Sequence, residues 1–276
     1  MAEIKKIATR EAYGAALVEM GKKREDFIVM DADLAAATKS GAFKKAFPER
    51  FYDCGIAEQN MVSIAAGIAA AGISVGEDGA THQCCEDIAL MRTIPGMTII
   101  NPADYTEAMK AVEAAFEHDG PVYMRFGRLA VPVVFDDDYK FEIGKGVELK
   151  EGNDVTIVAT GLMVNEALQA YETLKAEGIN ARIINIATIK PLDTEIILKA
   201  AKETGAIVTA EEHNIIGGLG SAVSEYLSEA CPVPVLKVGV KDTFGKSGPA
   251  NELLDIFGLR AKDIVQKAKE AVALKK

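Results

Sequence analysis

Short apolar runs alternate with helix-like patterns along almost the whole chain. The runs FIVMDADL, MTIINPAD and GPVYMRFG have the length and the β-branched content of buried strands. Between them, ATREAYGAALVEMGKK and YTEAMKAVEAAFEHDG repeat their apolar residues at helical spacing. This alternation is typical of α/β proteins, in which helices cover a mainly parallel sheet.

The alternation is interrupted once, at residues 131–146, where VPVVFDDDYKFEIGKG replaces it with charge and glycine. A second series of strands and helices then follows, in the order DVTIVATG, LMVNEALQAYETLKAEG, ARIINIATIKPLD, TEIILKAAKETG, AIVTAEEH, LGSAVSEYLSEA and VPVLKVGV, closed by a terminal helix. We therefore predict two α/β domains, residues 1–140 and 141–276, each with a mainly parallel sheet flanked by helices.

Composition narrows the possible partners. The 276 residues are 49% hydrophobic, and the formal net charge of −10 argues against nucleic-acid binding, which rewards clustered Lys and Arg. The first residues lack a signal-peptide core, and no apolar stretch is long enough to span a bilayer, so we expect a cytoplasmic protein without membrane contact. Cys54, Cys84, Cys85 and Cys231 lack CxxC or zinc spacing, which favours reduced thiols.

One carboxylate stands at the start of an alanine-rich apolar pattern. In FYDCGIAEQNMVSIAAGIAAAG, Glu58 lies in the opening turn of a predicted helix. Its position has a simple explanation, since a negative charge there meets the positive end of the helix dipole. Apolar surroundings would also raise the pKa of this carboxyl and make it a proton carrier. Both interpretations remain open from the residues alone.

A second candidate lies in GEDGATHQCCEDIALMR, residues 76–92. Its glycines allow a sharp turn at Asp78, and a helix is predicted to begin at Thr81 or His82. Asp78 and His82 would then share a corner between loop and helix, where α/β sheets bind ligands. A charged turn capped by Thr81 explains the same residues without any function.

Other motifs are weaker. Arg125 and Arg128 follow a predicted strand, where they could bind a substrate phosphate or form salt bridges to the acidic surface. EEHNIIGGLGSAV lacks the GxGxxG spacing of a dinucleotide loop, and its His213 is read as a structural histidine. The chain has no P-loop, nucleophile elbow, zinc pattern or metal-diphosphate motif, so the demanding chemistry must come from elsewhere.

Taken together, GIAEQNM, GEDGATHQ, EDIALMR, PGMTIINPAD, GPVYMRFGR and AEEHNIIGGLGSAV resemble the C-terminal half of transketolase, with its pyrimidine-binding and C-terminal domains. The resemblance covers nearly the whole chain. It implies the smaller subunit of a split transketolase, forming a homodimer through this chain. An N-terminal partner subunit would hold the diphosphate of thiamine diphosphate and the Mg²⁺ ion.

The resemblance also assigns roles. Glu58 matches the glutamate that contacts the aminopyrimidine ring across a subunit interface, so that the thiazolium carbon loses its proton and a two-carbon ketol unit moves between sugar phosphates. Glu58 and His82 are thus the expected catalytic residues. Asp78 is expected to contact a substrate hydroxyl, and Arg128 to contact the substrate phosphate. Thr38 and Ser40 are weaker candidates for phosphate contact. Asp33 is expected at the subunit interface, close to the cofactor.

One departure from the family follows Gly72. Family members carry several dozen more residues there, whereas here Ile73 leads directly into the GEDG loop. The absent piece holds the aromatic residues that stack on the cofactor and a substrate-binding histidine. Either this sequence omits a stretch that the working protein has, or the chain is a deletion form with weak or no cofactor binding.

Two further functions stay open. The chain could belong to another thiamine enzyme, such as deoxyxylulose-phosphate synthase or a 2-oxoacid dehydrogenase β subunit. It could also be a non-catalytic scaffold that dimerises.

Overall fold

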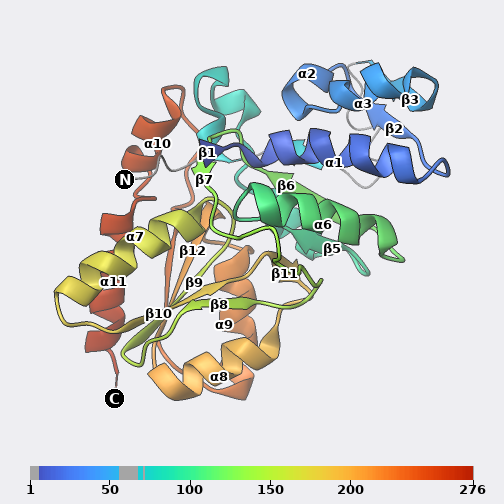
Figure 1. The fold of residues 1–276 in the computed structure, drawn as a ribbon. Coiled ribbons are helices and arrows are strands. Elements are labelled where there is room, and N and C mark those ends of the chain that lie inside the picture. The colour runs from blue at the N-terminus through green and yellow to red at the C-terminus, as the bar shows by residue number, and fades with distance from the viewer. Residues whose placement is uncertain (1–5, 56–67, 71, 276) are drawn as a thin grey trace.

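The computed structural model describes residues 6–55, 68–70 and 72–275 of the chain (Figure 1). Residues 56–67, which include Glu58, lie outside the described residues. None of the described helices has the length and apolar character needed to cross a membrane. The four cysteines are free thiols, with Cys85 buried and the other three half-buried.

The first half contains short helices and strands. They are β1 (Lys6–Ile7), α1 (Thr9–Lys23), β2 (Val29–Asp31), α2 (Ala35–Thr38), α3 (Gly41–Ala46), the 3-10 helix η1 (Pro48–Arg50), β3 (Phe51–Asp53), β4 (Ile68–Ala70), the 3-10 helices η2 (Ile73–Asp78) and η3 (Ala80–His82), α5 (Asp87–Arg92), β5 (Thr98–Ile100), α6 (Tyr105–Glu117), β6 (Val122–Phe126) and β7 (Val131–Pro132).

The second half is more regular. Its elements are β8 (Val147–Lys150), β9 (Val155–Ala159), α7 (Met163–Ala176), β10 (Ala181–Asn185), β11 (Thr188–Lys190), α8 (Thr194–Thr204), β12 (Ile207–Asn214), α9 (Leu219–Ala230), β13 (Val235–Val240), α10 (Ala250–Ile256) and α11 (Ala261–Ala273). Between β7 and β8 the chain has neither helix nor strand, and the predicted division near residue 140 falls in this stretch.

The sheet of the second half has the order β13-β12-β9-β10-β8, parallel except for the edge strand β8. Neighbouring residues of its strands face opposite layers. Ile157 and Val208 pack in the same core as α7 and α11, whereas Val158 and Ile207 pack with α8 and α9 (Figure 1). Both faces are covered, which explains why these strands read as continuous apolar runs.

The strands of the first half divide into separate sheets. β4, β6 and β5 are parallel, and β11 adds to β5 from the second half in antiparallel direction. β2 and β3 form a parallel pair of their own, while β1 pairs with β7. Helices α1 and α6 pack together on a core that includes Phe43 and Phe126. The predicted α/β class with mainly parallel sheets is confirmed.

Candidate active site

The loop between β4 and α5 carries two of the predicted site residues, Asp78 and His82. Gly76 and Gly79 have φ angles of 74° and 89°, so glycine is required for the two turns that expose Asp78. The prediction that a helix begins at Thr81 or His82 is wrong beyond the single turn of η3. Gln83 is extended and the next helix, α5, begins only at Asp87.

The delayed helix start has a physical cause. The side chain of Gln83 exchanges two hydrogen bonds with the backbone of Lys246, donating to the carbonyl at 2.8 Å and accepting from the amide at 3.0 Å. The carbonyl of Cys85 accepts from the backbone amide of Asn214 at 2.8 Å. Because these contacts draw residues 83–85 onto the second half, their backbone does not join a helix.

Asp78 and Arg128 meet at this loop. Nη1 of Arg128, just after β6, donates to the carboxylate of Asp78 and, at 3.2 Å, to the carbonyl of Val75. The two side chains are 44% and 32% exposed, so the pair is open to solvent. The hydrogen bond and charge of Arg128 lower the pKa of Asp78, with smaller contributions from His82 and Arg10.

His82 lies on the same exposed corner. Its Nδ1 is 3.1 Å from the hydroxyl of Thr81, its neighbour in sequence. His82 follows Asp78 by four residues in the same exposed loop, and Arg128 joins that loop through its hydrogen bond to Asp78. The corner therefore offers a carboxylate, a guanidinium and an imidazole to one ligand.

Asp33 and Thr38 lie on a separate segment, between β2 and α3. Asp33 is exposed with a φ of 64°, and its backbone amide donates to the carboxylate of Asp53 at 3.1 Å. The hydroxyls of Thr38 and Ser40 donate to Asp31 at 3.1 and 2.8 Å. These hydroxyls thus fix the turn after β2, and the structure records no contact between them and the Asp78 corner.

Arg125 does not face a ligand. Its side chain is 2% exposed, and Nε donates to the carboxylate of Asp87 at 2.9 Å. Its Nη2 donates to the carbonyls of Glu212, at 2.9 Å, and Cys84, at 3.2 Å. Arg125 does form a salt bridge, but the bridge is buried with Asp87 in the interior and does not lie on the acidic surface as predicted.

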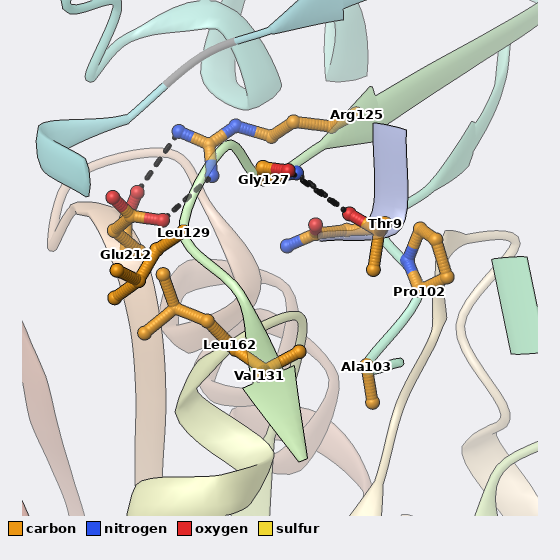
Figure 2. A pocket seen from close by; sticks show the side chains of 10 residues that line it. Thr9, Pro102, Ala103, Arg125, Gly127, Leu129, Val131, Leu162 and Glu212 are labelled. Atoms are coloured by element: carbon orange, nitrogen blue, oxygen red, sulfur yellow. Dashed lines mark hydrogen bonds and ion pairs between the residues drawn. The ribbon is translucent and has the colours of Figure 1, made fainter. Parts of the chain in front are cut away.

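A small pocket lies beside Arg125 (Figure 2). It is lined from the first half by Thr9, Asn101 and Arg125, and from the second half by Leu162 and Glu212. The strands β9 and β12 end nearby, at the position where the direction of strand addition reverses and where α/β sheets bind ligands. Its free volume of about 10 Å³ has room for a single water. It is too small for a cofactor or a sugar phosphate.

The second half also holds the helix that follows this loop, through His213, a contact that the sequence did not predict. His213 was predicted to be structural, and it is fully buried, with Nε2 accepting from the backbone amide of Ala89 at 3.3 Å. Burial lowers the pKa of His213 to about 4, which keeps it neutral and able to accept. The signal was two carboxylates and a histidine, EEH, at the end of an apolar strand.

Comparison with known proteins gives two family matches. Residues 5–73 and 70–133 match the family described as transketolase, pyrimidine binding domain, and residues 144–264 match transketolase, C-terminal domain. The first match is in two parts that overlap at residues 70–73, beside the position where the sequence is predicted to be shorter than its family.

Individual relatives agree over the length of the chain. A putative transketolase C-terminal section from Methanocaldococcus jannaschii is 43% identical, with 95% of each chain covered. That alignment spans 303 positions, so at least 27 of them (303 minus 276) have no counterpart here. The 6-deoxy-6-sulfo-D-fructose transketolase subunit SqwH of a Clostridium species is 41% identical, over 96% of this chain and 95% of the relative.

A solved structure titled "Split gene transketolase, inactive beta4 tetramer" is 47% identical, with a TM-score of 0.90 over 98% of this chain and all of that one. These matches cover both halves of this chain and at least 95% of each of the three relatives named. The chain belongs to the transketolase family, as a C-terminal section of the split type that joins a pyrimidine-binding domain to a C-terminal domain.

Proposed function

We propose that this chain is the C-terminal subunit of a thiamine-diphosphate-dependent transketolase. With an N-terminal partner subunit it transfers a two-carbon ketol unit between sugar phosphates. The observation that carries the proposal is the exposed corner where Asp78 and Arg128 meet beside His82. A sugar phosphate offers one group for each charged side chain, a phosphate for the guanidinium and hydroxyls for the carboxylate.

Arg128 is suited to a phosphate. Within the described part of the chain only its Nη1 has hydrogen-bond partners, so the other N–H groups can donate to phosphate oxygens. Asp78 has a lowered pKa and is ionised at neutral pH, which makes its carboxylate a hydrogen-bond acceptor for a sugar hydroxyl. His82 adds an imidazole that can exchange a proton with a substrate oxygen.

The cofactor supplies the carbon centre on which the two-carbon unit is carried. We assign Glu58 to contact the aminopyrimidine ring of the cofactor. Asp33 is assigned to the subunit interface close to the cofactor. The described residues contain no group of three or more His, Cys, Asp or Glu that could hold a metal ion. We assign Mg²⁺ and the diphosphate to the partner subunit, as in the family, and propose a cytoplasmic homodimer formed through this chain.

The test is reconstitution with the N-terminal subunit, thiamine diphosphate and Mg²⁺. We expect ketol transfer between sugar phosphates, abolished by Glu58→Ala and reduced by Asp78→Ala. Glu77→Ala removes an exposed carboxylate from the same loop and serves as the matched control, with most activity retained. Full activity in Glu58→Ala would overturn the assignment.

One observation favours a second function. The shortening at Gly72 removes family residues that contact the cofactor, so a non-catalytic subunit that assembles without binding it is the alternative. Calorimetric titration with thiamine diphosphate and Mg²⁺, with and without the partner subunit, separates the two. Tight binding in the assembly excludes the scaffold, and no binding in either case excludes the enzyme. A substrate panel of sugar phosphates and pyruvate separates transketolase from other thiamine enzymes.

A further inference from the structure

We propose that the C-terminal half positions the substrate-binding loop, with Glu212 and Gln83 as positioning residues. The inference rests on the proposed function, because it concerns the loop that carries Asp78 and His82. The name site loop is used here for residues 73–87. Although this loop belongs to the first half, its two ends and its middle are attached to β12 and to the segment after β13.

The beginning of the site loop is held by Glu212. Its carboxylate accepts a hydrogen bond of 2.5 Å from the backbone amide of Ser74, and both residues are buried. A side chain at Gly72 would place its Cβ 2.6 Å from the same carboxylate. The chain therefore passes so close to Glu212 that only glycine fits there.

The end of the site loop is held through Arg125. Its guanidinium donates hydrogen bonds to the carboxylate of Asp87 and to the carbonyl of Cys84. It also donates one to the backbone carbonyl of Glu212. Its Nη1 lies 4.0 Å from the Glu212 carboxylate (Figure 2). Glu212 is thus the common point to which both ends of the loop are tied. The side chain of Asp87 also accepts from the hydroxyl of Tyr123 at 2.8 Å.

The middle of the site loop is held by Gln83. Its two hydrogen bonds to the backbone of Lys246 anchor the residue that directly follows His82. Nearby, a Cβ on Gly79 would lie 2.9 Å from the hydroxyl of Ser247, so the loop and the segment after β13 are in close contact. Asp78 and His82 therefore lie between two attachments to the C-terminal half, at Ser74 and at Gln83.

Positioning of this kind matters because small displacements of a binding group are costly to catalysis. A hydrogen bond to a buried carboxylate stabilises a local structure strongly, and its loss raises the population of locally opened states by about tenfold or more. Removing either attachment should loosen Asp78 and His82 while leaving the core of the second half closed.

Hydrogen exchange of the chain alone tests the attachment. In Glu212→Ala we expect the amides of residues 73–78 to exchange about tenfold faster, whereas Glu212→Gln keeps an acceptor oxygen and stays close to the wild type. Gln83→Ala, which removes more exposed hydrogen bonds and leaves the core intact, should accelerate residues 79–85. In both variants the amides of β9 and β10 should keep their protection.

The matched control is Asp154→Ala. Asp154 accepts a 2.7 Å bond from the backbone amide of Asn180, at the amino ends of β9 and β10 and thus at the opposite edge of the sheet. Its loss should not change exchange in the site loop. Unchanged exchange of the loop in both Glu212→Ala and Gln83→Ala overturns the inference, as does equal acceleration in the control. If Glu212→Ala does not fold, the exchange of the site loop in Gln83→Ala alone tests the inference.

Kinetics of the reconstituted assembly give the second readout. We expect Gln83→Ala to lower kcat/KM for the sugar phosphate about tenfold, because the loop carries both the proposed substrate contact Asp78 and the proposed proton-exchanging residue His82. An unchanged kcat/KM contradicts the inference. If the wild-type assembly shows no ketol transfer, the proposed function fails, whereas the exchange experiment still tests the attachment of the loop.

Discussion

Glu107 offers a sharp test of how burial and hydrogen bonding compete in this protein. It lies in the first turn of α6, fully buried, and its carboxylate accepts from three donors. These are the amide of Ala103 at 2.7 Å, the hydroxyl of Tyr139 at 2.8 Å and the side-chain amide of Asn185 at 2.7 Å. The three donors come from the turn before α6, the connecting segment and β10, so Glu107 joins the two halves.

Burial raises the pKa of Glu107 from 4.5 to about 7, even though the three donors favour the ionised form. A folded pKa above the unfolded one means that the folded protein holds the proton more tightly. The stabilisation is complete below pH 4.5 and is lost as the pH rises through 7. Between pH 5 and pH 8 the free energy of unfolding should therefore fall by about 2.5 kcal/mol through this group.

The perturbation is Glu107→Gln, which cannot ionise. Its amide group faces the N–H of Ala103, so the variant should be destabilised by about 1–3 kcal/mol independently of pH. The measurement is urea unfolding followed by circular dichroism at intervals from pH 5 to pH 8, because the chain has no tryptophan. We expect the difference in unfolding free energy, wild type minus variant, to shrink by about 2.5 kcal/mol over this range.

The control is Glu113→Gln, an exposed carboxylate on the same helix. It should change the pH dependence little. A difference between wild type and Glu107→Gln that stays constant, or that widens as the pH rises, would refute the reasoning. The three donors would then outweigh burial, and Glu107 would be ionised inside the protein.

Other predictions use the same kinds of measurement. Gly218→Ala should lower Tm by about 3–10 °C, because its Cβ would lie 2.6 Å from Nδ1 of His213, while Gly127→Ala, with its nearest neighbour at 3.8 Å, should change Tm little. In Arg128→Met, NMR titration should show the pKa of Asp78 rising toward 3.8, and an unchanged pKa would mean that the two do not pair in solution. As the pH falls from 6.5 through 4, the free energy of unfolding of the wild type should drop by about 3 kcal/mol through His213, because the folded state resists protonation of this residue. In His213→Gln this drop should be absent. Equal acid sensitivity of the two proteins would contradict the prediction.

Local patterns in the sequence were enough to predict most elements of the fold. The segment LGSAVSEYLSEA is α9 from its first residue to its last, and the buried runs became β5, β6, β9 and β12. The run ARIINIATIKPLD was taken as one unit, but it forms β10 in one sheet and β11 in another. Periodicity reports which residues are buried and does not say against which sheet they pack.

In the candidate site, too, the sequence predicted what lies close along the chain and missed the contacts between distant residues. Asp78 and His82 were predicted to share a corner because they are close in sequence, and Arg128 joins them from the end of β6. The attachment of Ser74 to Glu212 joins residues 138 positions apart, and that of Gln83 to Lys246 joins residues 163 apart. Contacts of this range depend on how the two halves pack, which no local pattern encodes.

The position of β11 has a consequence for any attempt to separate the two halves. A fragment that stops near residue 140 would lose Thr188–Lys190, and with it the bonding partner along the outer side of β5. The exposed edge of β5 would present unpaired amides and carbonyls beside the apolar Ile99 and Ile100. Such an edge favours strand pairing between molecules and therefore aggregation. The first half therefore depends on a strand from the second half to cover the edge of its sheet, and the two are better studied together in one chain.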